Sequence, residues 1–152
     1  MHECMIEATE ELKRADHLIY VSLKYTRTVD VIKNIIERFI SSYDCLILAL
    51  LTKLKDEGKI EGIPDSPLEK ASLTKEKYGD EIINENIALY QLYRKIVKAD
   101  CRSAQEFRRH VTMTCIFKDG SEMNVDIDKI YEFYKKAKEF FEHIKKLSGG
   151  ND

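Results

Sequence analysis

The side chains most able to carry chemistry gather in one basic stretch of the chain. Two arginines and a histidine can together hold a phosphate and supply a proton. Arg102 and Arg109 are seven residues apart and share a face if this segment is one continuous helix. Tyr90 and Tyr93 lie just upstream, where their rings would stack on bases. The candidate phosphate- or RNA-binding residues are Arg94, Arg102, Arg108, Arg109 and His110, with Lys95 and Lys98 among them.

An ordinary solvated polar face is the alternative reading of this stretch, and other patterns that support chemistry are missing from the sequence. A structural zinc site shows ligands paired about two to four residues apart, and the one such pair, His2 with Cys4, lies at the terminus. The sequence contains no Gly-rich phosphate loop. We therefore expect no catalytic residues, no metal and no cofactor.

Apolar periodicity predicts the helices that would position these residues. Three- and four-residue steps indicate helices over 9–23, 31–55, 81–99 and 127–146. For the last helix, the predicted apolar stripe is Ile130, Tyr131, Tyr134, Ala137, Phe141 and Ile144.

Local signals add detail between these helices. Thr28 is a predicted N-cap for the second helix, with Asp30 favourably placed in its first turn. Residues 68–80 are predicted to form a loop or a short helix. Ser103 with Glu106 resembles a capping box that would open a short helix through Arg109.

The second helix has the strongest apolar character. Apolar side chains surround it on every side over residues 45–51, which is typical of a helix that is central in its domain or shared with a second subunit. Because a small bundle would leave one side uncovered, we expect self-association, most simply as a homodimer. The alternative is that the segment 63–80 or the hairpin covers this side.

Residues 111–127 predict a β-hairpin whose register follows from its side chains. Asp119-Gly120 is a hairpin turn signal. A two-residue loop would mix polar and apolar faces, whereas the three-residue loop 118–120 places the apolar partners on one face and Gly120 in the left-handed conformation. Ile116 is the exception on the polar face. The predicted pairs are Cys115 with Met123, Met113 with Val125 and Val111 with Ile127.

Composition and charge set the class of protein. The 152 residues carry 25 Lys+Arg against 27 Asp+Glu, a net charge of −2, which argues against nucleic-acid or membrane electrostatics for the chain as a whole. We expect one domain over 1–152, with a frayed tail at 148–152. No apolar run approaches the roughly 18–20 residues that span a bilayer.

The start of the chain and its cysteines suggest a compartment. The acidic N-terminal segment is unlike a signal peptide, so we expect a cytoplasmic protein. Cys4, Cys45, Cys101 and Cys115 are then expected to be reduced thiols. The richness in Ile, Lys and Glu is typical of thermophile sequences.

The order of elements resembles HEPN-type helical domains, small bundles found beside nucleotidyltransferases or acting as ribonucleases. The long helix pair at 14–23 and 31–54, and the segment 12–17 before the apolar helix, carry this resemblance. The family's ribonucleases place four to six residues between an arginine and a histidine. Here Arg14 and His17 are separated by two residues, and Arg102 and His110 by seven. The resemblance therefore implies a fold without carrying over catalytic residues.

The sequence predicts a mainly α protein, an antiparallel helical bundle with one β-hairpin before its C-terminal helix. The leading functional prediction is a non-enzymatic interaction or regulatory module that self-associates or binds a protein partner. The alternative is a small RNA-binding or ribonuclease-like domain that uses the basic stretch at 94–110. A metal-linked redox domain is a third reading, which the cysteine spacing disfavours.

Overall fold

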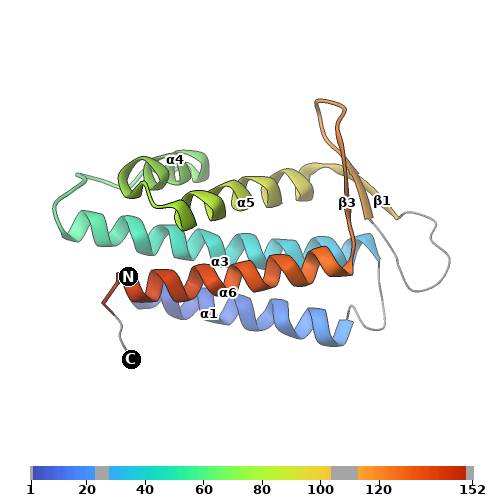
Figure 1. Ribbon diagram of the computed structural model, residues 1–152, viewed down its shortest axis with the longest axis horizontal. Coiled ribbons are helices and arrows are strands. Elements are labelled where there is room, and N and C mark those ends of the chain that lie inside the picture. The colour runs from blue at the N-terminus through green and yellow to red at the C-terminus, as the bar shows by residue number, and fades with distance from the viewer. Residues whose placement is uncertain (1, 23–27, 104–112, 150–152) are drawn as a thin grey trace.

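Helices make up most of the chain that the computed structural model describes, which covers residues 2–22, 28–103 and 113–149. They form a bundle with a small sheet at one end, directly before the last helix (Figure 1). The predicted mainly α fold is confirmed. The elements in chain order are α1 (His2–His17), the π-helix η1 (Leu18–Ser22), α3 (Val29–Asp56), α4 (Pro67–Tyr78), α5 (Glu81–Lys98), β1 (Asp100–Ser103), β2 (Met113–Ile116), β3 (Glu122–Val125) and α6 (Ile127–Leu147).

Helix α3 runs through the middle of the bundle and contacts α1, α4, α5 and α6 (Figure 1). It begins as predicted, because the Thr28 side chain accepts a hydrogen bond from the Val31 N–H at 3.2 Å. Leu46 and Leu50 are fully buried within the single chain. Leu48 and Cys45 of the same run are half-buried, and α4 packs against α3, so the segment 63–80 covers part of this side and self-association stays a prediction.

Two caps explain how the chain turns from α4 into α5. Residues 68–80 were the ambiguous segment, and most of them form α4, which begins with Ser66 as N-cap and Pro67 in its first turn. Gly79 ends α4 in the left-handed conformation at φ +59°. Asp80 then caps α5 by accepting from the Ile82 N–H at 2.8 Å. The predicted start of α5 at residue 81 is confirmed.

Helix α1 begins at His2, earlier than the predicted start at residue 9. Ala8, Leu12 and Ala15 of α1 and Ile19 of η1 are buried, and they pack in the common core with α3. The helix continues as the π-turn η1. The first residues were missed because His2, Glu3 and Glu7 give the segment little apolar periodicity.

The predicted hairpin register is confirmed. Cys115 lies opposite Met123 and Met113 opposite Val125. The loop is the predicted one, because the Phe117 N–H donates to the Ser121 carbonyl at 2.9 Å and Gly120 has φ +88°. The third predicted pair, Val111 with Ile127, includes Val111, which lies outside the described residues. Its partner Ile127 begins α6.

A third strand, β1, pairs with β2 and makes the sheet three-stranded, in the order β1-β2-β3. Ser103 ends this strand and pairs with Met113, and the helix that it was expected to cap lies outside the described residues. Arg102 also lies in the strand, so the expected continuous helix from Arg102 to Arg109 is wrong. The remaining residues of that expected helix, 104–109, lie outside the described part of the chain.

A disulfide bond joins Cys101 of β1 to Cys115 of β2. The two cysteines are direct cross-strand neighbours, with Cα atoms 4.0 Å apart. Cys4 and Cys45 are free. The expectation of four reduced thiols is therefore wrong for one pair, because strand pairing brings together two cysteines that are 14 residues apart in the sequence.

Helix α6 faces the core with a stripe that differs from the predicted one. Its buried side chains are Ile130, Phe133, Ala137, Phe140 and Ile144. Phe140 lies 5.0 Å from the Tyr43 ring and Phe133 4.9 Å from the Tyr93 ring, measured between ring centroids. The expected core residue Tyr131 is 42% exposed.

Candidate functional site

The predicted basic stretch is divided between two elements. Arg94, Lys95 and Lys98 lie on the C-terminal half of α5, where both lysines are exposed and Arg94 is half-buried. Arg102 lies on β1 and pairs with Asp100 at 3.2 Å, with both side chains exposed. The other predicted contacts lie outside the described residues, namely Arg108, Arg109 and His110.

The two tyrosines expected to stack on bases are core residues. Tyr90 is 1% exposed and Tyr93 is fully buried. The Tyr90 hydroxyl donates to Asp44, and the Arg94 guanidinium lies 5.7 Å from the Tyr90 ring centroid. Burial raises the pKa of the Asp44 carboxyl. The stacking prediction is therefore wrong, because these rings face the bundle rather than solvent.

A cleft of about 720 Å³ lies between the end of α5 and the hairpin. Its apolar side chains are Leu92 from α5 with Ile116 and Phe117 from the hairpin arm. Ile116 is 37% exposed, one of the large apolar side chains that solvent reaches. The cationic side chains that line the cleft are Lys95, Lys98 and Lys118.

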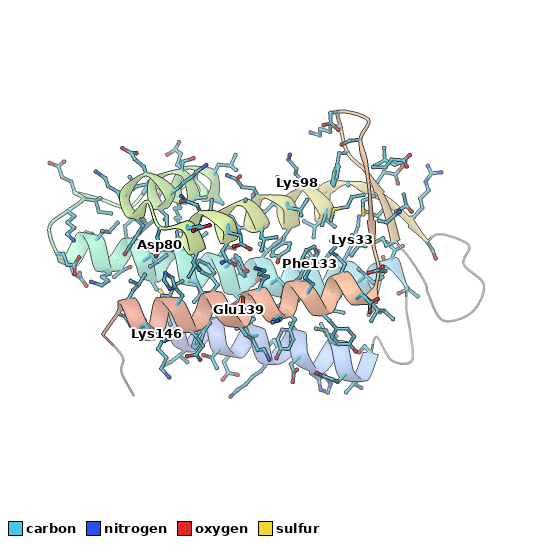
Figure 2. The ribbon with its side chains drawn as sticks, viewed as in Figure 1. Lys33, Asp80, Lys98, Phe133, Glu139 and Lys146 are labelled. Carbon is cyan, nitrogen blue, oxygen red and sulfur yellow. A yellow bond between two sulfur atoms is a disulfide. The ribbon has the colours of Figure 1, made fainter. Side chains whose placement is uncertain are left out.

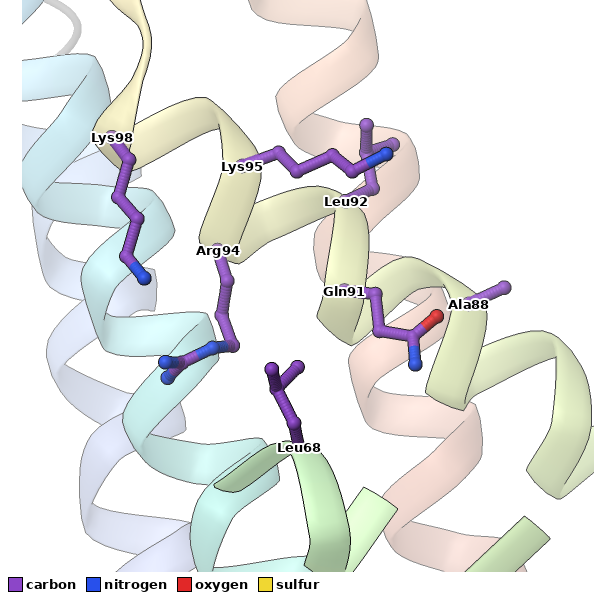
Figure 3. Close-up of a pocket in the computed structure, with 7 residues that line it drawn as sticks. All are labelled: Leu68, Ala88, Gln91, Leu92, Arg94, Lys95 and Lys98. Carbon is purple, nitrogen blue, oxygen red and sulfur yellow. The ribbon is translucent and has the colours of Figure 1, made fainter. Parts of the chain in front are cut away.

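A second hollow of about 350 Å³ continues along α5 toward the start of α4. Figure 3 shows Leu68 reaching from α4 toward α5, with Arg94 and Lys98 on one side of it and Gln91 on the other. Because Leu92, Lys95 and Lys98 line both hollows, we treat them as one surface, the α5–hairpin cleft.

Two contacts fix the walls of the α5–hairpin cleft. The Lys33 ammonium of α3 donates to the Ala99 carbonyl at 2.9 Å, which fastens the end of α5 to the central helix. Figure 2 labels Lys33 and Lys98 at this end of the bundle. The Cys101–Cys115 disulfide joins β1, which continues directly from α5, to the hairpin. Both walls are therefore tied to the core.

The two carboxylates in the cleft are already engaged. Asp100 pairs with Arg102. The Ser121 hydroxyl and N–H both donate to Asp119, and these bonds, with Lys95 nearby, lower the pKa of its carboxyl. The described residues that line the cleft include no histidine or cysteine. The cleft offers a ligand the ammonium groups of exposed lysines beside apolar side chains.

Sequence reasoning found the α5 side of the cleft and missed the hairpin side. Lys118, Ile116 and Phe117 were assigned to a hairpin with no position relative to α5. One signal for them existed, since Ile116 was the apolar exception on the polar face of the hairpin. A single exposed apolar side chain is common on protein surfaces, and Ile116 indicates a contact surface only together with Leu92 and Phe117, which line the same cleft.

Comparison of the chain with protein-family models, curated proteins and solved structures finds no match to any of them. Over residues 2–22, 28–103 and 113–149, none of the helices is long and apolar enough to cross a membrane. Within the same ranges, no three His, Cys, Asp or Glu side chains gather as metal ligands. Cys101 and Cys115, which were considered as ligands, are bonded to each other.

Proposed function

We propose that the protein is a non-enzymatic interaction module that binds an acidic, apolar segment of a partner protein in the α5–hairpin cleft. The observation that carries the proposal is Ile116, which stays 37% exposed in a cleft lined by lysines. An apolar partner side chain would gain by covering Ile116, Phe117 and Leu92. Burying one large aliphatic side chain contributes about 1.5–3 kcal/mol.

The charges at the cleft select the chemistry of the partner. Lys95, Lys98 and Lys118 are free of ion pairs with the described residues. Carboxylates of a partner would therefore meet three ammonium groups that form no ion pair in the described chain, although Lys95 also lies near Asp119. Such complementarity steers association and disfavours basic partners.

RNA is the second candidate, because Arg94, Lys95 and Lys98 lie on one side of the end of α5. It has less support than a protein segment, since the tyrosines that would stack on bases are buried. A single-strand site combines cationic side chains with exposed aromatic rings. In the described cleft, the only aromatic ring is that of the half-buried Phe117.

A competition experiment separates these candidates. A fluorescein-labelled peptide of alternating glutamate and leucine is titrated with the protein and followed by fluorescence anisotropy. We expect saturable binding that the unlabelled peptide reverses and that a lysine–leucine peptide does not. Saturable binding of fluorescein-labelled oligouridylate, together with no saturable binding of the acidic peptide, would overturn the proposal in favour of RNA.

Three further expectations stay predictions. Self-association through α3 or its neighbours is the first, and sedimentation at micromolar concentration tests it. The resemblance to HEPN-type domains rests on the antiparallel pair α1 and α3. A cytoplasmic location is compatible with the disulfide if the source is a hyperthermophile, because intracellular proteins of such organisms are disulfide-rich.

A further inference from the structure

A second concave surface lies at the other side of the bundle, between the end of α1 and the first half of α3. It encloses about 430 Å³. Its side chains come from positions that share a face on each helix, at three- and four-residue spacing. Those with nitrogen donors are Lys13, Arg14, His17, Asn34 and Arg38.

One carboxylate organises the two arginines of this pocket. Glu11 is only 12% exposed at its side chain, and its Oε1 accepts from the Arg14 guanidinium. Its Oε2 accepts from the Arg38 guanidinium at 3.0 Å. A buried carboxylate needs such partners, and it fixes both guanidinium groups in return.

Both arginines retain donors after binding Glu11. A guanidinium carries about five N–H donors, and Arg14 and Arg38 each give one nitrogen, Nη1, to Glu11. The Arg38 Nε–H has no acceptor among the described residues but is buried from solvent, so the donors left for an anion are the remaining Nη hydrogens of the two arginines. Glu11 therefore positions the arginines without using up their capacity to bind an anion.

The charges of this pocket also favour an anion. Lys13, Arg14 and Arg38 are balanced in part by Glu10 and Glu11, and the Lys13–Glu10 pair is loose, at 3.8 Å and well exposed. His17 is exposed at the rim and adds a ring N–H donor. Helix α1 continues into η1, so its terminal carbonyl groups lie beyond His17.

We propose that Arg14, His17 and Arg38, held by Glu11, form a binding site for a phosphate group. The planar fork of arginine matches the oxygen geometry of phosphate, and two forks held by one carboxylate give a preorganised pair. The phosphate belongs either to a small phosphorylated ligand or to a nucleic-acid backbone. The two surfaces share no lining residue, but Arg38 also lines a hollow of about 270 Å³ together with Arg94 and Lys98, so this site adjoins the α5–hairpin cleft.

The test uses the full chain at low ionic strength, with inorganic phosphate and a short oligouridylate as the two probes. Nuclear magnetic resonance follows the His17 ring protons while each probe is added. We expect saturable shifts with at least one probe. Tighter binding of the oligonucleotide than of phosphate identifies a nucleic-acid backbone, and phosphate binding alone identifies a small ligand.

Arg14→Gln is the decisive variant, because Arg14 is 61% exposed at its side chain and its loss is tolerable for folding. It should weaken binding of the responding probe about tenfold, the value of one charge-assisted hydrogen bond. Lys59→Gln is the control, an exposed cation that also pairs with one carboxylate and lies in neither proposed site, and it should bind as the wild type does. No saturable shift with either probe, or equal affinity in the Arg14→Gln and wild-type proteins, would overturn the proposal.

Discussion

Asp100 and Ile116 face each other across β1 and β2, and both line the α5–hairpin cleft. The next pair along the same two strands is the disulfide Cys101–Cys115. The covalent link is therefore adjacent to the residues that form one wall of the cleft. Because β1 follows α5 directly, the disulfide couples the hairpin to the helix that supplies Lys95 and Lys98.

Removing the disulfide should lower the stability of the protein. Its cysteines are separated by 14 residues, and closing a loop of that size contributes about 3 kcal/mol to the free energy of unfolding. The Cys101→Ala/Cys115→Ala protein should lose about that much in urea unfolding, as should the wild type in reductant. The Cys4→Ala/Cys45→Ala protein is the control and should respond to reductant as the wild type does. Equal stability of the wild type with and without reductant would contradict the stabilising role of the Cys101–Cys115 disulfide.

Cys45 should react slowly with thiol reagents although it is only half-buried. Burial, followed by the hydrogen bond to Glu7, raises the pKa of its thiol to about 12. Since the thiolate is the reactive form, alkylation at about pH 8 should be far slower than for a free cysteine with a pKa near 8.5. Mass spectrometry of iodoacetamide-treated protein measures the rate. Glu7→Gln should accelerate it, and no acceleration would contradict the role given to Glu7.

The Asp80–His143 pair should make the free energy of unfolding depend on pH in the acidic range. Burial opposes ionisation of Asp80, but bonds from His143 at 2.6 Å and from the Ile82 N–H outweigh it and lower the pKa of the carboxyl. A lowered pKa in the folded state gives stability that is present above about pH 4 and lost as the pH falls through the folded value. Asp80→Asn keeps a capping oxygen and should cost about 1 kcal/mol at neutral pH. Its unfolding free energy should then change less than that of the wild type at acidic pH, and an identical pH profile would refute this.

Two buried tyrosines should respond oppositely to loss of their hydroxyl groups. The Tyr43 hydroxyl donates to Asn86 at 2.7 Å, and both residues are buried. Tyr43→Phe leaves the Asn86 oxygen without this donor, which should cost about 1–3 kcal/mol. The Tyr93 hydroxyl has no hydrogen-bond partner among the described residues, so Tyr93→Phe should be neutral or stabilising. Thermal unfolding of the two variants makes the comparison, and a loss as large for Tyr93→Phe as for Tyr43→Phe would contradict it.

Much of the fold follows from sequence patterns that are compatible with only one arrangement of the chain. The hairpin register is one, because a slip by one residue moves Cys115 and Met113 to the polar face. The apolar stripe of α6 has more than one solution. Phe133-Tyr134 and Phe140-Phe141 are adjacent aromatic pairs, and either member of each pair suits an apolar face. Only packing against α3 and α5 decides the rotation of that helix.

Strand β1 and the hairpin side of the cleft are consequences of tertiary structure. Residues 100–103 show no apolar alternation, and just one of them, Cys101, is other than exposed. The sequence pattern therefore predicts neither their pairing with β2 nor the disulfide. The sequence predicted Arg94, Lys95 and Lys98 as solvent-facing cations, but it carried no information on where the hairpin docks. The cleft that they share with Ile116 could be identified only from the structure.

The most direct test of the proposed function is the affinity of the glutamate–leucine peptide for two isoleucine variants, measured by fluorescence anisotropy. Ile116→Thr keeps the β-branched shape but removes apolar surface from the cleft, and Ile82→Thr does the same to an isoleucine that is 43% exposed at the far end of α5. We predict that Ile116→Thr weakens peptide binding about tenfold while Ile82→Thr leaves it unchanged. Equal affinities for the wild type and Ile116→Thr, with both folded, would contradict the assignment of the α5–hairpin cleft as the binding surface.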